Sequence, residues 1–148
     1  HVWVLADDIY EHLVYDNFRF VTPAQVEPGL RDRTLTVNGV SKAYAMTGWR
    51  IGWMVLPAHL IERVRTAKSL ADTGSSVMDQ IAFAQLLTSG GYDRHLRQMR
   101  RRYPPRRDAL LSALSRHLPQ AEVLGAAAGV HLPVRFPLGF PIDEEEKA

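Results

Sequence analysis

The hydrophobic pattern of the first third of the chain consists of short apolar runs separated by polar loops. Residues 2–6 form a continuous apolar run that ends in two acids. This run predicts a buried, parallel strand with Asp7 at its carboxyl end. Residues 34–37 alternate between polar and apolar side chains and include β-branched ones. Residues 51–56 form a third apolar run, which ends at Pro57. We therefore predict three strands, separated by a loop rich in proline and glycine over residues 18–33.

After Pro57 the apolar positions recur at helical spacing. Two successive helices are predicted from the apolar positions Leu60, Val64, Ala67, Ala71, Val77, Ile81, Ala84 and Leu87. An arginine-rich helix is expected from about Asp93, and we expect Pro104 and Pro105 to kink or end it because proline has no amide hydrogen to donate. A helix over residues 106–118 and strands over residues 121–124 and 130–136 complete the pattern. The order predicts an α/β layer followed by the start of a second lobe.

Composition places the chain among ordinary soluble domains, with 46% apolar and 23% charged residues. The absence of cysteine excludes disulfides, a thiol nucleophile and cysteine-ligated zinc. No apolar run approaches the roughly 18 residues of a membrane span, so we expect no membrane partner. No secretory signal precedes the first acids, so the cytoplasm is the expected compartment.

The net charge is only +2, but the positive charges are concentrated in one segment. Eight arginines and a single acid, Asp108, lie between Arg94 and Arg116. Because Tyr103 is the only aromatic residue nearby, we interpret this run as a solvated helix face and expect no nucleic-acid partner. The six histidines form no pair at helical spacing, so no metal site is expected. The acidic residues 143–146 are expected to be a solvated end.

Lys42 lies in a position suited to chemistry. It follows the second predicted strand on a loop of small residues, and open α/β sheets bind ligands at the carboxyl ends of their strands. A lysine that is partly removed from water has a lowered amine pKa and can attack a carbonyl group to form a Schiff base. The alternative interpretation is an ordinary solvated loop lysine.

Two further groups could serve a bound ligand. Arg50 precedes the third strand, and its planar guanidinium could hold a phosphate, or else form a surface ion pair. Asp7 ends the first strand with Tyr10 three residues later. A buried carboxylate there needs a cationic partner such as a protonated ring nitrogen, although Asp7 or Asp8 could instead cap a helix.

Together these residues form a pattern. The Asp7-x-x-Tyr10 spacing and residues 41–52, which read Ser-Lys-Ala-Tyr-Ala-Met-Thr-Gly-Trp-Arg-Ile-Gly, resemble the fold type I pyridoxal-phosphate enzymes. Residues 2–55 are most similar to class I aminotransferases of the aspartate aminotransferase branch. Residues 56–140 resemble the aminotransferase-like domain of MocR-type transcription regulators, on the motifs at residues 74–80, 92–97, 106–110 and 128–132.

The resemblance implies a fold and a domain division. The expected fold class is α/β, a partial three-layer sandwich of the pyridoxal-phosphate transferase large domain with the start of a smaller α+β lobe. Residues 1–100 would belong to the large cofactor-binding domain, and residues 101–148 to the small C-terminal domain.

The resemblance also implies a role for each site residue. Lys42 would hold pyridoxal 5′-phosphate covalently and then move a proton between the substrate and the cofactor. Asp7 would pair with the ring nitrogen, Tyr10 would donate to the phenolic oxygen, and Arg50 would clamp the phosphate. Many members carry a serine where this chain has Gly39, so only the Gly39 backbone amide could bind the phosphate there. Ser41 is a possible substitute.

The implied function is amino-group transfer between an amino acid and a 2-oxo acid by a homodimer. Members of the family are more than twice as long as this chain. Their glycine-rich phosphate loop, the aromatic ring stacked on the cofactor and the substrate-binding arginine have no counterpart here, so we expect the isolated chain to be inactive. The alternatives are a regulator domain that senses pyridoxal phosphate without turnover, and a structural fragment without cofactor.

Overall fold

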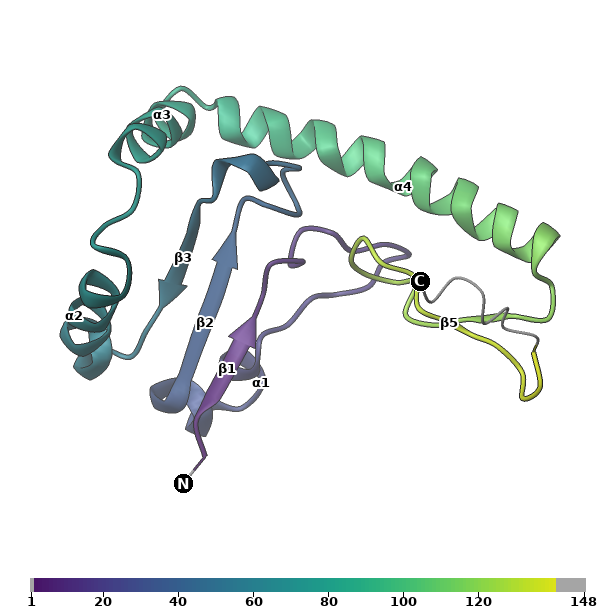
Figure 1. The fold of residues 1–148 in the computed structure, drawn as a ribbon, viewed down its shortest axis with the longest axis horizontal. Coiled ribbons are helices and arrows are strands. Elements are labelled where there is room, and N and C mark those ends of the chain that lie inside the picture. Colours follow the sequence, from purple (N-terminus) through teal and green to yellow (C-terminus); the bar gives the residue numbers. More distant parts are fainter. Residues whose placement is uncertain (1, 141–148) are drawn as a thin grey trace, which may run out of the picture.

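The computed structural model describes residues 2–140 and shows a small sheet with a long helix beside it (Figure 1). The sheet contains β1 (Val4–Asp7), β2 (Thr34–Gly39) and β3 (Gly52–Val55), in the order β1-β2-β3. β1 is parallel to β2, and β3 is antiparallel to β2. The three predicted strands are confirmed, with ends that differ by at most two residues from those expected.

Short helical segments connect the strands. α1 (Pro23–Val26) and η1 (Pro28–Arg33) lie between β1 and β2, and each begins at a proline, whose fixed φ suits the first position of a helix. η2 (Thr47–Trp49) precedes β3, and η3 (Ala58–Leu60) follows it. The loop between β1 and β2 therefore contains more local structure than expected.

Three α-helices follow the sheet: α2 (Ile61–Asp72), α3 (Val77–Thr88) and α4 (Gly91–His117). α2 ends where Thr73 adopts a left-handed conformation, next to Gly74. α3 begins with an N-cap, in which the Ser76 hydroxyl accepts a hydrogen bond from the Asp79 amide at 3.4 Å. The helices predicted from the apolar spacing are confirmed.

The expected end of the helix at Pro104 and Pro105 is wrong, because α4 continues through both prolines as a single helix of 27 residues. Contacts on either side compensate for the two missing amide donors. Leu96 and Met99 are buried before the prolines, and Arg107 binds Asp16 after them. Tertiary contacts of this kind can outweigh the local cost of proline in a helix.

The core lies at the carboxyl end of β2, under the first half of α4. It is formed by Leu13, Val40, Ala43, Tyr44 and Leu96. Tyr92 stacks on Tyr44 with ring centroids 4.2 Å apart, and Phe83 contacts Tyr92 edge to face. Stacked and edge-to-face aromatic pairs of this geometry add about 0.5–1.5 kcal/mol beyond their buried area.

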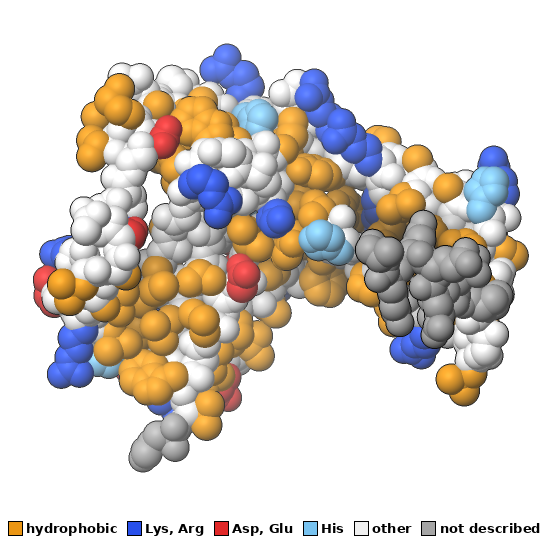
Figure 2. Space-filling model, in the orientation of Figure 1, with side chains coloured by type: hydrophobic (Ala, Val, Ile, Leu, Met, Phe, Trp, Pro, Cys, Tyr) orange, Lys and Arg blue, Asp and Glu red, His pale blue; other side chains and the backbone are white. Residues whose placement is uncertain are grey.

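The sheet itself is largely open, so the expectation of a buried first strand is wrong for this chain. Ala6 is buried, but Leu5 is 69% exposed and Val55 is 62% exposed. The physical reason is that the described residues supply no layer over these side chains. Figure 2 shows hydrophobic side chains gathered on the surface over this region.

The C-terminal part of the described chain follows α4 back toward the sheet (Figure 1). β4 (Glu122–Val123) and β5 (Val134–Arg135) form an antiparallel pair, shorter than the strands predicted there. The Tyr15 amide donates to the Ala127 carbonyl at 2.9 Å, which ties this part to the loop after β1.

The expected domain boundary at residue 100 falls inside α4, and the division stays a prediction. The acidic residues 143–146 lie outside the described residues.

No helix within residues 2–140 is both long enough and apolar enough to cross a membrane.

Candidate active site

The topology of the sheet brings Asp7, Lys42 and Arg50 to the same edge. Asp7 is the last residue of β1 and pairs with Val37, near the end of the parallel strand β2. Gly39 ends β2 opposite Gly52, the first residue of the antiparallel strand β3. Lys42 follows Gly39 by three residues and Arg50 precedes Gly52 by two, so all three candidates leave the sheet at one edge.

Lys42 lies on a turn over residues 40–46, called the lysine turn below, which contains several of the best-buried side chains of the described residues. Val40 is 0% exposed and Tyr44 is 2% exposed, while Lys42 between them is only half-buried. The Lys42 carbonyl accepts hydrogen bonds from the Ala45 amide at 3.1 Å and from the Tyr103 hydroxyl at 2.9 Å. Among residues 2–140, no hydrogen bond or ion pair engages the Lys42 amine, so a firmly held backbone presents a free amine.

Tyr44 fixes the far end of the turn. Its carbonyl lies 2.6 Å from His95 Nε2 on α4, which donates to it. Its ring stacks on Tyr92, while its hydroxyl is buried without a hydrogen-bond partner in the described part of the chain. Burial raises the pKa of Tyr44, so the hydroxyl remains protonated.

Asp7 is exposed at the end of β1. Its Oδ1 accepts a hydrogen bond from the Ile9 amide at 3.3 Å. This bond closes a turn, and no helix begins here, so the alternative of a helix N-cap is not supported. No cation pairs with Asp7 among the described residues, which leaves the carboxylate available to a cationic group.

Tyr10 packs toward the C-terminal part of the chain. Its ring meets His131 edge to face with centroids 6.2 Å apart, and it lies next to Gly129. Within residues 2–140 no hydrogen bond joins Tyr10 to Asp7, Lys42 or Arg50. Its role toward a cofactor therefore stays a prediction from the resemblance.

Arg50 adopts a left-handed backbone conformation, with φ 52° and ψ 36°. For a residue with a Cβ this costs about 1–2 kcal/mol, and such strain is concentrated at functional sites. One terminal nitrogen of its guanidinium donates to the Thr47 carbonyl at 3.2 Å. No carboxylate pairs with Arg50 among the described residues. Its side chain lines an open hollow of about 590 Å³ between β3 and the helices α2 and α3.

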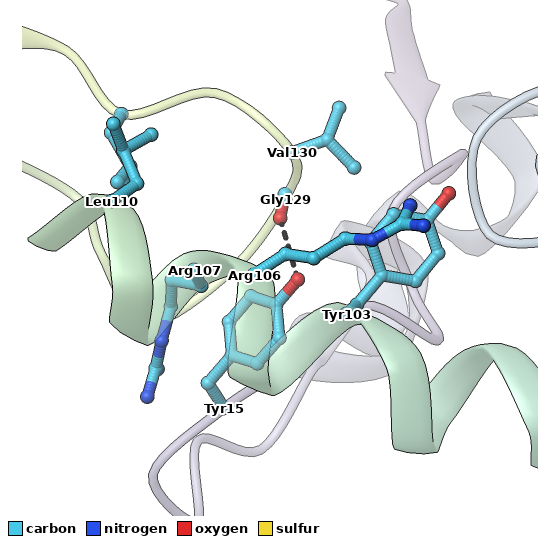
Figure 3. A pocket seen from close by; sticks show the side chains of 8 residues that line it. Tyr15, Tyr103, Arg106, Arg107, Leu110, Gly129 and Val130 are labelled. Atoms are coloured by element: carbon cyan, nitrogen blue, oxygen red, sulfur yellow. Dashed lines mark hydrogen bonds between the residues drawn. The ribbon is translucent and has the colours of Figure 1, made fainter.

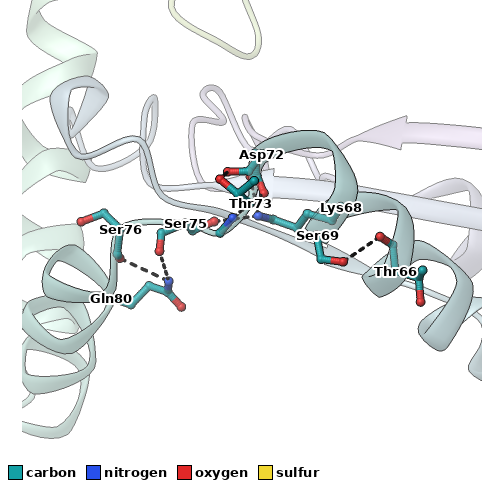
Figure 4. A network of polar contacts seen from close by, with 9 residues as sticks. Thr66, Lys68, Ser69, Asp72, Thr73, Ser75, Ser76 and Gln80 are labelled. Atoms are coloured by element: carbon teal, nitrogen blue, oxygen red, sulfur yellow. Dashed lines mark hydrogen bonds and ion pairs between the residues drawn. The ribbon is translucent and has the colours of Figure 1, made fainter.

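A polar network lies on the other side of this hollow (Figure 4). The Lys68 amine donates to Asp72 Oδ2 at 2.6 Å and to the Ser75 hydroxyl at 2.7 Å. The Gln80 amide donates to the Ser75 and Ser76 carbonyls at 3.4 and 3.2 Å. The network fixes the link between α2 and α3. It engages the Lys68 amine, whereas no group within residues 2–140 engages the Lys42 amine.

Gly39 is required by a close approach of two strands. A Cβ at this position would lie 2.9 Å from the Ile51 carbonyl oxygen and 3.2 Å from the Gly52 Cα. A serine side chain therefore does not fit in this backbone arrangement. The Gly39 amide donates to Asn38 Oδ1 at 2.7 Å, so the expected contact of this amide with a phosphate would have to replace that bond.

The arginine-rich face of α4 is mostly solvated, as expected for Arg94, Arg97 and Arg101. Arg107 differs, because its side chain is only 12% exposed. It binds both Asp16 oxygens, at 2.7 and 3.0 Å, and lies 4.5 Å from the centre of the Tyr15 ring. It joins α4 to the loop after β1.

Arg107 and Tyr15 line a smaller hollow of about 200 Å³ together with Tyr103 (Figure 3).

No group of three or more His, Asp or Glu residues in the described ranges is arranged to hold a metal ion. The sequence did not single out His95 or Tyr103 as contacts of the lysine turn. The only available signal was that both lie on the face of α4 that carries the buried Leu96 and Met99.

Comparisons with known proteins agree with this arrangement. The family model for aminotransferases of class I and II matches residues 1–137. Aspartate aminotransferase from Rhizobium meliloti strain 1021 is 51% identical over 115 residues, which are 78% of this chain and 28% of that protein. Aspartate/prephenate aminotransferase from Cereibacter sphaeroides is 48% identical over 114 residues, or 77% of this chain and 28% of that protein.

Solved structures show the same fold. The crystal structure of the Rhizobium meliloti aspartate aminotransferase superposes with a TM-score of 0.74 and 46% identity, over 88% of this chain and 32% of that one. N-succinyldiaminopimelate aminotransferase from Mycobacterium tuberculosis gives 0.74 at 32% identity, over 87% of this chain and 32% of that one. The resemblance of residues 56–140 to regulators stays a prediction.

The chain spans less than a third of the length of these curated relatives. The predicted fold class, a part of the α/β fold of these enzymes, is confirmed. The chain therefore belongs to the class I and II aminotransferases, a family of pyridoxal-phosphate enzymes of fold type I.

Proposed function

We propose that this chain provides the lysine-bearing part of a pyridoxal-phosphate-dependent aminotransferase. The observation that carries the proposal is the free Lys42 amine on a firmly held turn, at the same sheet edge as Asp7 and Arg50. Family membership supplies the reaction class, because the relatives at 40–51% identity are named as aspartate or aspartate/prephenate aminotransferases.

The residues at this edge fit the cofactor in charge and chemistry. Lys42 offers a primary amine to an aldehyde. Asp7 offers a protonated ring nitrogen a carboxylate that pairs with no cation in the described part of the chain. Arg50 offers the remaining donors of a guanidinium to a phosphate, because no carboxylate pairs with it among the described residues. Tyr10 would donate to the phenolic oxygen, as the family resemblance implies.

Pyridoxal phosphate, when bound, supplies an electron sink for the negative charge that develops at the substrate α-carbon. Asp7 favours this chemistry because its negative charge holds a proton on the ring nitrogen. With the cofactor and an amino acid bound, the Lys42 amine would be the base that removes the α-proton and, once protonated, the acid that returns a proton. Arg50 orients the reacting atoms by fixing the phosphate end.

The proposed substrates are an amino acid and a 2-oxo acid, and the names of the relatives point to aspartate as the amino donor. The proposed assembly is a homodimer in the cytoplasm. The site also needs segments that the matched relatives have and this chain does not span, so turnover by the isolated chain is not expected. Cofactor attachment is therefore the property to measure.

The test is covalent trapping of the cofactor. The chain is mixed with pyridoxal phosphate, reduced with borohydride, digested, and analysed by mass spectrometry. We expect the added mass on the peptide that contains Lys42. Lys42→Arg keeps the charge but removes the reactive amine, and we expect it to abolish that labelling.

Lys68→Arg is the matched control, because the Lys68 amine is already engaged by Asp72 and Ser75. It should leave the labelling of Lys42 unchanged. Equal labelling of Lys42 and Lys68, at a rate typical of solvated lysines, would show that Lys42 is an ordinary surface lysine and would overturn the proposal.

A further inference from the structure

We propose that Tyr103 on α4 is a positioning residue for Lys42: its hydroxyl fixes the Lys42 carbonyl and so sets the direction in which the amine leaves the turn. The proposal rests on the proposed function of Lys42. It adds a group more than sixty residues away along the chain, which forms a hydrogen bond with the backbone of the lysine and not with the proposed reacting amine.

The contact itself is well formed. The Tyr103 hydroxyl donates to the Lys42 carbonyl at 2.9 Å, while the Ala45 amide donates to the same oxygen at 3.1 Å. Two donors on one carbonyl use both of its lone pairs and fix the plane of the peptide that follows Lys42. Burial raises the pKa of Tyr103, which keeps its hydroxyl protonated and able to donate.

A second contact from the same helix holds the other end of the turn. His95 Nε2 lies 2.6 Å from the Tyr44 carbonyl, two residues after Lys42. Leu96 and Met99, which lie between His95 and Tyr103 on α4, are both buried. The helix therefore holds two carbonyls of the lysine turn from one packed face, and a packed helix is far stiffer than a loop.

The hydroxyl of Tyr103, and not only its ring, is needed in this arrangement. Tyr103 and Tyr15 line the same hollow, but their hydroxyls point to different sides (Figure 3). The Tyr15 hydroxyl donates to the Gly129 carbonyl at 3.0 Å, away from the lysine turn. The two tyrosines thus make hydrogen bonds of the same kind to carbonyls in two different places, and Tyr15→Phe is a matched control for Tyr103→Phe.

The first measurement needs no cofactor. Hydrogen–deuterium exchange of the whole chain is followed in peptides that cover residues 40–46. Exchange there is compared with exchange in peptides from β2, so that a change in global stability cancels. Loss of one hydrogen bond in Tyr103→Phe should speed exchange in residues 40–46 by about fivefold relative to β2, whereas Tyr15→Phe should leave this ratio unchanged. An unchanged ratio in Tyr103→Phe, or an equal rise of the ratio in both variants, would overturn the proposal.

The second measurement uses the chain loaded with pyridoxal phosphate. An achiral cofactor shows circular dichroism only when it is held in a fixed orientation, so the dichroism per unit of cofactor absorbance reports positioning at Lys42. We expect this ratio to fall at least twofold in Tyr103→Phe and to stay the same in Tyr15→Phe. Simple destabilisation would lower absorbance and dichroism together, and an unchanged ratio in Tyr103→Phe would therefore count against positioning.

The two measurements separate this proposal from the proposed function. If the unmodified chain never attaches the cofactor to Lys42, the proposed function fails, and the exchange rates alone decide whether Tyr103 holds the turn. If attachment occurs and both variants behave like the unmodified chain, the proposed function stands and the role of Tyr103 is refuted.

Discussion

The lysine turn and the sheet beside it differ sharply in how well this chain buries them. In the turn, Val40 and Tyr44 are almost completely buried, and two side chains of α4 bind its backbone. In the sheet, Leu5 and Val55 are mostly exposed although both are apolar. The chain therefore contains its own support for the turn that carries the proposed chemistry, but not for the sheet from which that turn emerges.

The difference shows that one part of the fold places the candidate site residues and another part buries and holds the lysine. The sheet sets where Asp7, Lys42 and Arg50 leave the strands, through register alone. α4 sets how rigidly the lysine is held, through packing and hydrogen bonds. Substitutions in the two regions should therefore affect different properties.

The largest effect is expected for the core of the turn. Tyr44→Ala removes a ring that is 2% exposed and stacked on Tyr92, and it should lower the free energy of unfolding by about 3–5 kcal/mol. Leu5→Ala in the open sheet should change it by less than about 0.5 kcal/mol. Urea unfolding followed by circular dichroism measures both. A similar loss for the two variants would remove the contrast between the regions.

The next effect concerns association through the open sheet. Alternation and register put Leu5 and Met54 on one face, with Leu35 and Val37 between them. We expect copies of the chain to associate through this face, because covering one such side chain contributes about 1.5–3 kcal/mol. Leu5→Lys with Met54→Lys should shift the molecules toward monomers in light scattering. Monomers at all concentrations of the unmodified chain would contradict this expectation.

A smaller effect of opposite sign is expected at the Tyr44 hydroxyl, which is buried without a partner among the described residues. Tyr44→Phe removes this unsatisfied group and keeps the ring, so it should raise the free energy of unfolding by about 1 kcal/mol. Tyr15→Phe loses a formed hydrogen bond and should lower it by a similar amount. Thermal unfolding of the two variants gives the comparison, and a loss of stability in Tyr44→Phe would show that its hydroxyl does have a partner.

The smallest effect is the pH dependence of the link between α4 and the loop after β1. The hydrogen bond from Arg107 lowers the pKa of Asp16 below its usual value. A carboxyl group with a lowered pKa in the folded state contributes stability above its unfolded pKa of about 3.9, and this contribution disappears as the pH falls through the folded pKa.

The predicted result is that Asp16→Asn destabilises the chain slightly at neutral pH and less at about pH 3, because Asp16 loses its charge as the pH falls. The effect is small because the Asp16 side chain is exposed, which weakens the pair. Denaturant unfolding at both pH values measures the change. Asp32→Asn, which removes an exposed carboxylate without an ion pair in the described structure, is the control. An equal loss at both pH values would show that charge is not involved.

Local pattern was sufficient to predict the strands, the helices and the order in which they occur. The apolar runs located β1, β2 and β3, and the helical spacing located α2 and α3. Burial was not predictable in the same way. The apolar sequence of β1 indicates that the strand is suited to burial, but it does not show whether this chain supplies the layer that covers it. The continuity of α4 through Pro104 also depends on distant contacts, such as that between Arg107 and Asp16, which no local pattern contains.

The site was partly predictable for the same reason. Lys42, Asp7 and Arg50 could be placed at one edge because each lies next to a strand end, and strand order follows simple rules. Tyr103 and His95 were not found, because their partners are backbone carbonyls, and any sequence offers carbonyls at every position. Their contacts depend on the packing of α4 over the turn, which only the structure shows.

The position of the proline pair within α4 has a mechanical consequence. Tyr103, which touches the lysine turn, comes just before Pro104, and Arg107, which binds the loop after β1, comes just after Pro105. A helix bends most easily where its own hydrogen bonds are missing. The weakest turn of α4 therefore lies next to both contacts, and the two contacts together resist bending of the helix there.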